Sequence, residues 1–270
     1  MAIQENKSTK TGVGHGTQEW AVKTINCCSG CSHDCRYCYA KAIAVRFKRA
    51  SAGTWSTECV RQHDVSKLHK KYDGQVMFPS SHDITPTNLD DCLTVLRCLI
   101  IVGNRVLIVS KPHLECIKTL CKAFRPYRRR MLFRLTIGAC DDRILSYWEA
   151  NAPSYAERKA SLKYAFDQGF RTSVSVEPML DSANIDVLIS DLSPYATHSI
   201  WIGTMNHLWR LEKHADGNLM RAIEQIRRGQ AKSVINAIYD RHKDNPLIRW
   251  KNEIKKIVGI PIPKKNGLDI

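Results

Sequence analysis

The 270-residue chain is long enough for one large hydrophobic core, and its longest apolar run, around residues 99–102, is far too short to cross a bilayer. It carries 41 lysines and arginines against 26 aspartates and glutamates, a formal net charge of +15, which favours a polyanion such as nucleic acid as a partner. Eleven cysteines without an apolar N-terminal secretion signal indicate a reducing compartment, so we expect a soluble, cytoplasmic protein with no membrane partner.

Hydrophobic patterning along the chain predicts six β-strands that alternate with helices. Residues 1–18 are polar and glycine-rich and predict a flexible N-terminal arm, after which residues 19–270 are expected to form a single domain. The strands are expected at 20–26, 75–80, 105–111, 131–138, 171–180 and 198–204. The helices are expected at 40–49, 88–102, 114–124, 141–150, 154–168, 185–192, 218–242 and 247–258.

Strands that alternate with helices pair in parallel through right-handed crossovers. The sequence therefore predicts an α/β fold, a partial (β/α)6 TIM-type barrel of parallel strands with C-terminal helices. Active sites of parallel barrels lie at the C-terminal ends of the strands, so the polar residues that follow the strands are candidates for one common site. They are Ser80, Ser81, His82, Asp83, Ser110, Lys111, Thr136, Cys140, Ser175, Glu177, Thr204, Asn206 and His207.

Three cysteines with C-x3-C-x2-C spacing, Cys31, Cys35 and Cys38, directly follow the first expected strand. Closely spaced thiolates are ligands for iron–sulfur clusters or zinc. A structural zinc site usually takes four protein ligands, whereas a [4Fe–4S] cluster held by three cysteines leaves one iron open to a substrate or cofactor. The alternative is a zinc site completed by His33, His63 or Cys59, although no second half-site follows at ribbon or finger spacing.

The cysteine motif, with Tyr37 in its aromatic position, resembles the signature of the radical S-adenosylmethionine (SAM) superfamily. The wider string GCSHDCRYCYA at 30–40 is similar to the spore-photoproduct-lyase-like branch and its phage-associated relatives. The resemblance implies that SAM chelates the open iron and that one electron from the reduced cluster cleaves it to methionine and a 5′-deoxyadenosyl radical, which abstracts hydrogen from a substrate. It also implies an external electron donor of the flavodoxin or ferredoxin type.

The strand-end residues offer the groups that SAM recognition requires. Lys111 can pair with the SAM carboxylate, and Glu177 with its ammonium or ribose. The resemblance agrees, because the lyase-like branch has a lysine after the third strand and the related phage proteins carry a Ser-x-Glu-Pro string, matched here at 175–178. It also implies that the backbone of Tyr37 contacts adenine. Further hydrogen-bonding candidates are Ser81, Asp83 and Thr136.

Two residues are candidates for hydrogen transfer. Tyr39 follows the last motif cysteine, where the lyase has a tyrosine that relays hydrogen; the alternative is that it packs against the cysteine loop. The lyase has a hydrogen-donating cysteine after its second strand, where this chain has Ser80, so thymine-dimer repair is not expected. Cys140, after the fourth strand, is a candidate replacement donor; the alternative is a small buried hydrophobic side chain.

Charge and family branch together favour a nucleic-acid base or nucleotide as the substrate of a lyase-like or modifying reaction. The alternatives are a radical SAM modifier of a peptide or small metabolite, and a zinc-containing nucleic-acid-binding module without enzymatic activity. The densest basic run, at 125–130, precedes the fourth strand and is expected at the opposite end of the barrel from the site. Basic residues at 227–256 are candidates for the rim of the barrel mouth.

Overall fold

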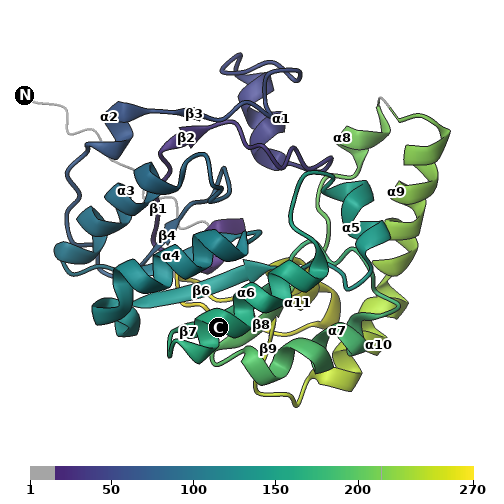
Figure 1. Ribbon diagram of the computed structural model, residues 1–270. Coiled ribbons are helices and arrows are strands. Elements are labelled where there is room, and N and C mark those ends of the chain that lie inside the picture. Colours follow the sequence, from purple (N-terminus) through teal and green to yellow (C-terminus); the bar gives the residue numbers. More distant parts are fainter. Residues whose placement is uncertain (1–15, 214) are drawn as a thin grey trace, which may run out of the picture.

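The computed structural model describes residues 16–213 and 215–270. Its centre is a curved sheet of seven strands in the order β1-β4-β5-β6-β7-β8-β9, and every neighbouring pair is parallel (Figure 1). These strands are β1 (Lys23–Thr24), β4 (Gln75–Phe78), β5 (Arg105–Ser110), β6 (Met131–Thr136), β7 (Arg171–Val176), β8 (Ser199–Ile202) and β9 (Ile248–Trp250). The predicted α/β partial barrel of parallel strands is confirmed.

Helices cover the outer face of the sheet and connect its strands (Figure 1). They are α1 (Tyr39–Arg46), α2 (Gln62–Val65), α3 (Leu89–Ile101), α4 (Leu114–Phe124), α5 (Asp142–Trp148), α6 (Tyr155–Asp167), α7 (Ile185–Leu192), α8 (Trp209–Glu212), α9 (Gly217–Gly229), α10 (Lys232–His242) and α11 (Asn252–Val258). The 3-10 helices are η1 (Gly16–Glu19), η2 (Arg125–Arg130) and η3 (Ser193–Tyr195). Beside the cysteine loop, β2 (Cys28–Ser29) and β3 (Cys59–Val60) form a short antiparallel pair.

The strands are buried on both faces, as is usual for parallel sheets covered by helices. Along β6, Met131, Phe133 and Leu135 pack in the large core beneath the helices, and the residues between them face the barrel interior. This alternation places Leu132 in an interior cluster with Trp20 and Trp201. The same alternation brings Thr136 to the inner face at the C-terminal end of the strand.

The barrel interior contains a buried ion pair between Arg134 and Asp269. The Arg134 guanidinium, which has no exposed side-chain surface, lies 4.7 Å from the ring of Trp20 and 5.5 Å from that of Trp201. Its Nη2 forms an ion pair with Asp269 at 2.8 Å. Because both ions are largely removed from water, each depends on the other for compensation.

The C-terminal region differs from the sequence prediction. The helix expected at 218–242 is two helices, α9 and α10, because α9 ends at Gly229, whose Cα lies so close to Ser182 that an added Cβ would meet Ser182 Oγ at 2.4 Å. The helix expected at 247–258 begins as a seventh strand, β9, in which Ile248 and Trp250 are buried and pair with β8. Alternating apolar residues in three positions gave too short a signal to separate this strand from the helix that follows.

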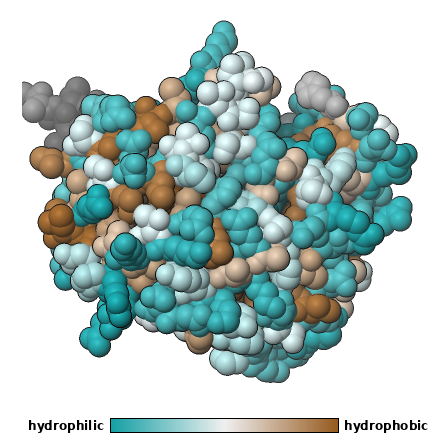
Figure 2. All heavy atoms as spheres, viewed as in Figure 1, coloured by the Kyte–Doolittle hydropathy of each residue, from teal (hydrophilic) through white to brown (hydrophobic). Residues whose placement is uncertain are grey.

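The arm expected over residues 1–18 lies mostly outside the described residues, and residues 16–18 belong to η1. Within the described part of the chain, none of the helices has the length and apolar character needed to cross a membrane. Hydrophilic side chains cover most of the face shown in Figure 2.

We expect that Asp269→Ala lowers the free energy of unfolding by about 3 kcal/mol, because it leaves the Arg134 charge buried without a partner. Urea denaturation would measure the change. Asp167→Ala is the matched control, since it removes a mostly exposed i,i+4 pair with Lys163 and should cost less than about 0.5 kcal/mol. Equal effects of the two substitutions would contradict a structural role for the buried pair.

Candidate functional site

A cavity of about 750 Å³ opens at the C-terminal ends of the strands. The three motif cysteines line one wall, and the loops after β4, β5, β6, β7 and β8 all contribute to the rest. The structure thus brings together nearly all the residues that the strand-end rule singled out. The strand-end candidates that line the cavity are Ser80, Ser81, His82, Asp83, Lys111, Thr136, Ser175, Glu177, Thr204, Asn206 and His207, and the cysteine loop adds Cys31, Cys35, Tyr37, Cys38 and Tyr39.

Hydrogen bonds and a close backbone approach shape the cysteine loop. Gly30 has a positive φ of 85°, and an added Cβ would meet the Thr57 carbonyl oxygen at 2.1 Å, so glycine is required there. Cys38 is the N-cap of α1, where its Sγ accepts a hydrogen bond from the Lys41 amide at 3.4 Å. The helix N-terminus favours the negative charge of a thiolate at this position.

Burial dominates the acid–base behaviour of the three thiols. It raises the pKa of Cys31 and Cys38, and that of Cys35 to about 12. A metal cation has to displace these protons before it can bind the sulfurs, and thiolate coordination supplies the energy to do so. Three thiols on one cavity wall therefore fit a soft metal centre such as an iron–sulfur cluster.

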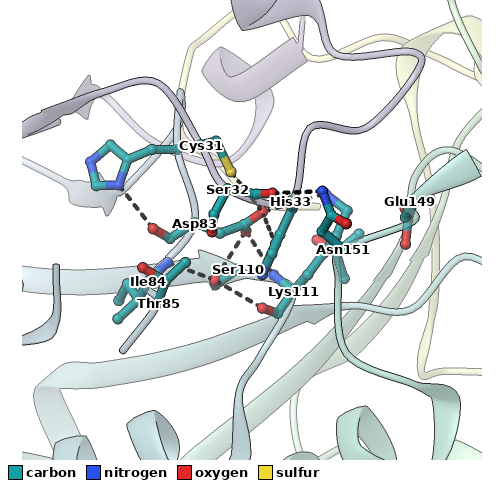
Figure 3. Close-up of polar contacts among 12 residues, drawn as sticks. Cys31, Ser32, His33, Asp83, Ile84, Thr85, Ser110, Lys111, Glu149 and Asn151 are labelled. Carbon is teal, nitrogen blue, oxygen red and sulfur yellow. Dashed lines mark hydrogen bonds and ion pairs between the residues drawn. The ribbon is translucent and has the colours of Figure 1, made fainter. Parts of the chain in front are cut away.

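The carboxylate of Asp83 is the centre of the polar network beside the cysteines (Figure 3). Its Oδ1 accepts hydrogen bonds from the Ser110 hydroxyl at 3.0 Å and from the Lys111 amide at 2.8 Å. Its Oδ2 lies 2.8 Å from His33 Nδ1, 3.6 Å from Lys111 Nζ and 3.7 Å from Cys31 Sγ. Burial opposes ionisation, but the charges of Lys111 and His33 outweigh it and hold the pKa of Asp83 well below its usual range.

Asp83 therefore already has protein partners at both oxygens. It links the cysteine loop to the end of β5, and it also lines the cavity, so its role as a hydrogen-bonding partner of SAM stays a prediction. Ser110, also singled out at that strand end, is buried and serves the same network, because its hydroxyl additionally accepts the Ile84 amide at 3.0 Å.

A second network ties the cysteine loop to β6. The Tyr37 hydroxyl donates to Glu149, whose other oxygen lies 2.6 Å from Arg158 Nη1, with both charged side chains fully buried. Arg158 also donates to the Thr136 carbonyl at 3.3 Å. Sequence reasoning missed Glu149 and Arg158, because both lie in or beside segments expected as ordinary helices and belong to no motif.

Tyr39 reaches across the cavity wall from α1. Its hydroxyl donates to the Ser80 carbonyl oxygen, and the amides of Ser80 and Ser81 both donate to Asn26 Oδ1, at 2.7 and 2.8 Å. Ser80 itself lines the cavity, so the position matched to the lyase's donor cysteine does face the site. Asn26 was not singled out from the sequence, where it ends the first expected strand without any distinguishing pattern.

An acidic corner lies on the β7–β9 side of the cavity. Glu177 and Glu253 both line it, and the buried Lys251 ammonium lies 3.3 Å from Glu177 and 3.1 Å from Glu19. Lys251 Nζ also lies 4.2 Å from the centroid of the Trp20 ring. Desolvation raises the pKa of Glu177, and desolvation together with the nearby Glu177 raises the pKa of Glu253 to about 7. The sequence prediction singled out Glu177 but missed Lys251 and Glu253, because the strand β9 that precedes them was expected as helix.

Cys140, the candidate hydrogen donor, is not among the residues that line the cavity. The chain continues four residues beyond the end of β6 before reaching it, and Cys140 is partly buried against the main hydrophobic core. The structure therefore places it where the alternative interpretation, a small hydrophobic side chain, expects it.

The three candidates for a fourth zinc ligand differ in position. Donor atoms of Cys31, His33 and Asp83 lie within 4.8 Å of one another, so His33 is the nearest of them to the cysteines. Both ring nitrogens of His33 already have partners, with Nδ1 2.8 Å from Asp83 and Nε2 2.9 Å from His113 Nε2. His63, with a side chain 88% exposed, and the exposed Cys59 do not line the cavity. Of these candidates, His33 alone has a donor atom grouped with a motif thiol, and both of its ring nitrogens are engaged by other side chains.

Comparison with solved structures identifies the fold. Spore photoproduct lyase with bound AdoMet and dinucleoside spore photoproduct is 14% identical, with 75% of this chain and 60% of that chain covered and a TM-score of 0.51. A variant of the same lyase gives a TM-score of 0.55 at 13% identity over 84% of this chain and 75% of that chain. SuiB of Streptococcus suis, bound to S-adenosylmethionine, gives 0.52 at 10% identity, covering 88% of this chain and 49% of SuiB. Both proteins are radical SAM enzymes, and this chain has their partial-barrel fold.

In sequence, the chain is 26% identical over 181 residues to the uncharacterized protein ORF301 of Acidianus two-tailed virus, covering 62% of this chain and 58% of that protein. No protein-family model matches the chain. The chain spans about 60% of the length of this viral relative and of the lyase structure compared first. The viral relative agrees with the phage-associated proteins that the cysteine motif resembles.

We expect Glu253 to make stability depend on pH. Its pKa rises from an ordinary 4.5 to about 7 in the fold, so its contribution to stability is complete below pH 4.5 and is lost as the pH rises through 7. A shift of this size corresponds to about 3 kcal/mol. Glu253→Gln keeps an oxygen to accept the Thr204 amide but cannot lose a proton. In urea titrations, its unfolding free energy should therefore fall less between pH 5 and pH 8 than that of the wild type.

Glu115→Gln is the control for that series, because Glu115 is exposed and pairs only with Lys118 in the described chain. It should leave the pH profile of the wild type unchanged. If Glu253→Gln and wild type lose the same free energy over this pH range, the carboxylate does not carry a raised pKa.

Proposed function

We propose that this protein is a radical SAM enzyme in which Cys31, Cys35 and Cys38 hold a [4Fe–4S] cluster and SAM binds at the open iron. The observation that carries the proposal is the position of three thiols on one wall of a cavity at the strand ends, with Cys31 and Cys35 buried and Cys38 half-buried. The fold, shared with radical SAM enzymes solved with bound SAM, supports it. The position of His63 and Cys59 outside the cavity, and the engagement of both His33 ring nitrogens by Asp83 and His113, also favour it over a four-ligand zinc site.

When bound, the cluster and SAM would supply reductive cleavage of SAM to a 5′-deoxyadenosyl radical that abstracts hydrogen from the substrate. The chain's own residues would bind SAM and orient it. Lys111 presents a buried ammonium close to Tyr37, with its Nζ 5.8 Å from the ring centroid, and suits the SAM carboxylate. Glu177 suits the ammonium or ribose, the hydroxyls of Ser81 and Thr136 suit further hydrogen bonds, and the backbone of Tyr37 suits adenine.

Tyr39 is the candidate for hydrogen transfer that the cavity retains. Its hydroxyl lies at the loop after β4, beside Ser80, on the wall shared with the cysteines.

The cluster requires an external reductant, for which we propose a flavodoxin or ferredoxin type of electron donor. All eleven cysteines are free thiols, the state expected for a protein of the cytoplasm.

For the substrate we propose a nucleic-acid base or nucleotide, modified or cleaved in a lyase-like reaction. The net charge of +15 supports a polyanion, and the lyase of the same fold is solved with a dinucleoside photoproduct. A peptide is the second candidate, because SuiB bound to its precursor peptide SuiA matches 91% of this chain with a TM-score of 0.52. Ser80 in place of a thiol argues against thymine-dimer repair itself.

We expect that the protein, reconstituted anaerobically with iron and sulfide and reduced with dithionite, converts SAM to 5′-deoxyadenosine. Cys31→Ala, Cys35→Ala and Cys38→Ala should each abolish this product, because a cluster needs all three thiolates. Chromatography of the products and iron and sulfide analysis measure both effects.

Cys59→Ala is the matched control, since Cys59 is exposed and lies outside the cavity. It should retain iron, sulfide and product formation at the wild-type level. A colourless protein that contains zinc, no acid-labile sulfide and no deoxyadenosine activity would contradict the proposal and favour a zinc-containing binding module.

A further inference from the structure

Helix α1 presents an unpartnered aromatic and apolar stripe that runs outward from the cavity. Tyr39, Ile43 and Phe47 follow one another at four-residue intervals, which places them on one face of the helix and its C-cap. Tyr39 and Ile43 line the cavity, and Phe47 continues the stripe beyond it with 63% of its surface exposed. The guanidinium carbons of Arg46 and Arg49 each lie 5.7 Å from the Phe47 ring centroid.

A similar group lies at the α8 side of the cavity. Trp209 is 52% exposed, and its ring centroid lies 5.4 Å from the Arg210 guanidinium carbon and 5.0 Å from Lys213 Nζ. His207 packs edge-on against Trp209 and, like Arg210, lines the cavity. Both α1 and α8 project from the upper edge of the molecule, with the loop after β6 between them (Figure 1). We call these groups the α1 cluster (Tyr39, Ile43, Arg46, Phe47 and Arg49) and the α8 cluster (His207, Trp209, Arg210 and Lys213).

The cations of both clusters carry no ion pair within the described residues. Neighbouring carboxylates are used elsewhere, because Asp34 pairs with Lys41 and Glu212 pairs with Arg227. Lys256, which also lines the cavity, is likewise without an ion pair in the described chain. The rim therefore combines exposed aromatic rings with uncompensated positive charge. These cations are Arg46, Arg49, Arg210, Lys213 and Lys256.

We propose that the α1 and α8 clusters together bind a single-stranded or locally unpaired nucleic acid across the cavity mouth. Unstacked bases would lie on the rings of Phe47 and Trp209, while the flanking arginines and lysines contact phosphates. Sequence-tolerant binding of single strands depends on this combination of aromatic stacking platforms and basic grooves. A duplex has no free base faces for such rings, so a strand with exposed bases fits the chemistry better.

This inference rests on the proposed function for its biological meaning, since it specifies how the substrate would reach the cavity. Binding itself is tested without a cluster. The probe is a fluorescent 20-nucleotide single strand of mixed sequence, titrated with full-length protein at several salt concentrations and followed by anisotropy. We expect Phe47→Ala and Trp209→Ala each to weaken binding about tenfold, within the range for losing one stacked base. Arg210→Ala should reduce the salt slope by about one.

Tyr127→Ala is the matched control. Tyr127 is also an exposed aromatic residue beside arginines, but it lies in η2, before β6 and away from the cavity. It should change affinity less than twofold. Because Phe47 and Trp209 are exposed, thermal unfolding followed by circular dichroism should show the same midpoint in all variants.

Any of three results would overturn the inference. One is equal affinity of the wild type and the Phe47→Ala/Trp209→Ala double variant, and a second is a loss of affinity in Tyr127→Ala equal to that in Phe47→Ala or Trp209→Ala. Binding of an acidic peptide of similar charge with the same sensitivity to both substitutions, and no binding of the single strand, would also overturn it and favour a peptide substrate. A protein that forms deoxyadenosine but fails these binding tests refutes the docking surface alone. A protein that binds the strand as expected but forms no deoxyadenosine refutes the radical SAM proposal alone.

Discussion

The organisation of the cavity depends on one buried carboxylate, that of Asp83. Taking this anion out of water is unfavourable, and the cost is offset only because the Lys111 ammonium, the His33 ring, the Ser110 hydroxyl and the Lys111 amide all converge on its two oxygens. These partners come from the cysteine loop and from the end of β5, whereas Asp83 follows β4. A single side chain thus fixes three segments relative to one another, and with them the position of the Cys31 thiol, 3.7 Å from its carboxylate. Loss of that carboxylate would leave the Lys111 ammonium buried and unpaired beside the three cysteines.

The opposite wall depends on a different balance of charge. Lys251 is surrounded by Glu19 and Glu177, with Glu253 close enough for its pKa to rise to about 7. More carboxylates than ammonium groups meet here, so this wall favours protons or hydrogen-bond donors and disfavours anions. The cysteine wall is built by the cysteine loop and by the residues that follow β4 and β5, whereas Glu177 follows β7 and Lys251 and Glu253 follow β9. The electrostatic asymmetry of the cavity therefore reflects which strand ends build each wall.

Much of this architecture could be predicted from the sequence, because its signals are local. β-branched runs such as that at 105–110 mark the strands, and the rule that polar residues gather at strand ends correctly placed Lys111, Thr136 and Glu177 on one cavity. The cysteine spacing identified the loop that we propose to hold the cluster. The residues that the sequence prediction missed make contacts that are distant in sequence. Glu149 accepts from Tyr37, 112 residues away, and Lys251 pairs with Glu19 near the other end of the chain. Short β9 is stabilised as a strand by its pairing with β8, which its own three residues do not reveal. Cys140 lies four residues beyond the end of β6, where it packs partly buried against the core and does not line the cavity.

The two halves of the site are joined through helix α1. Cys38 caps its N-terminus with the same sulfur that the proposed cluster would use, and the stripe of Tyr39, Ile43 and Phe47 starts at the next residue. The distance from these thiols to the rim is therefore set by a helix of about two turns. At the rim the charges are positive, while inside the cavity Glu177 and Glu253 present carboxylates. A phosphate is attracted to the rim and repelled from that inner wall, so a nucleic-acid strand bound there would keep its backbone outside. Only an uncharged base could then enter between the acidic corner and the cysteines, where hydrogen abstraction would take place.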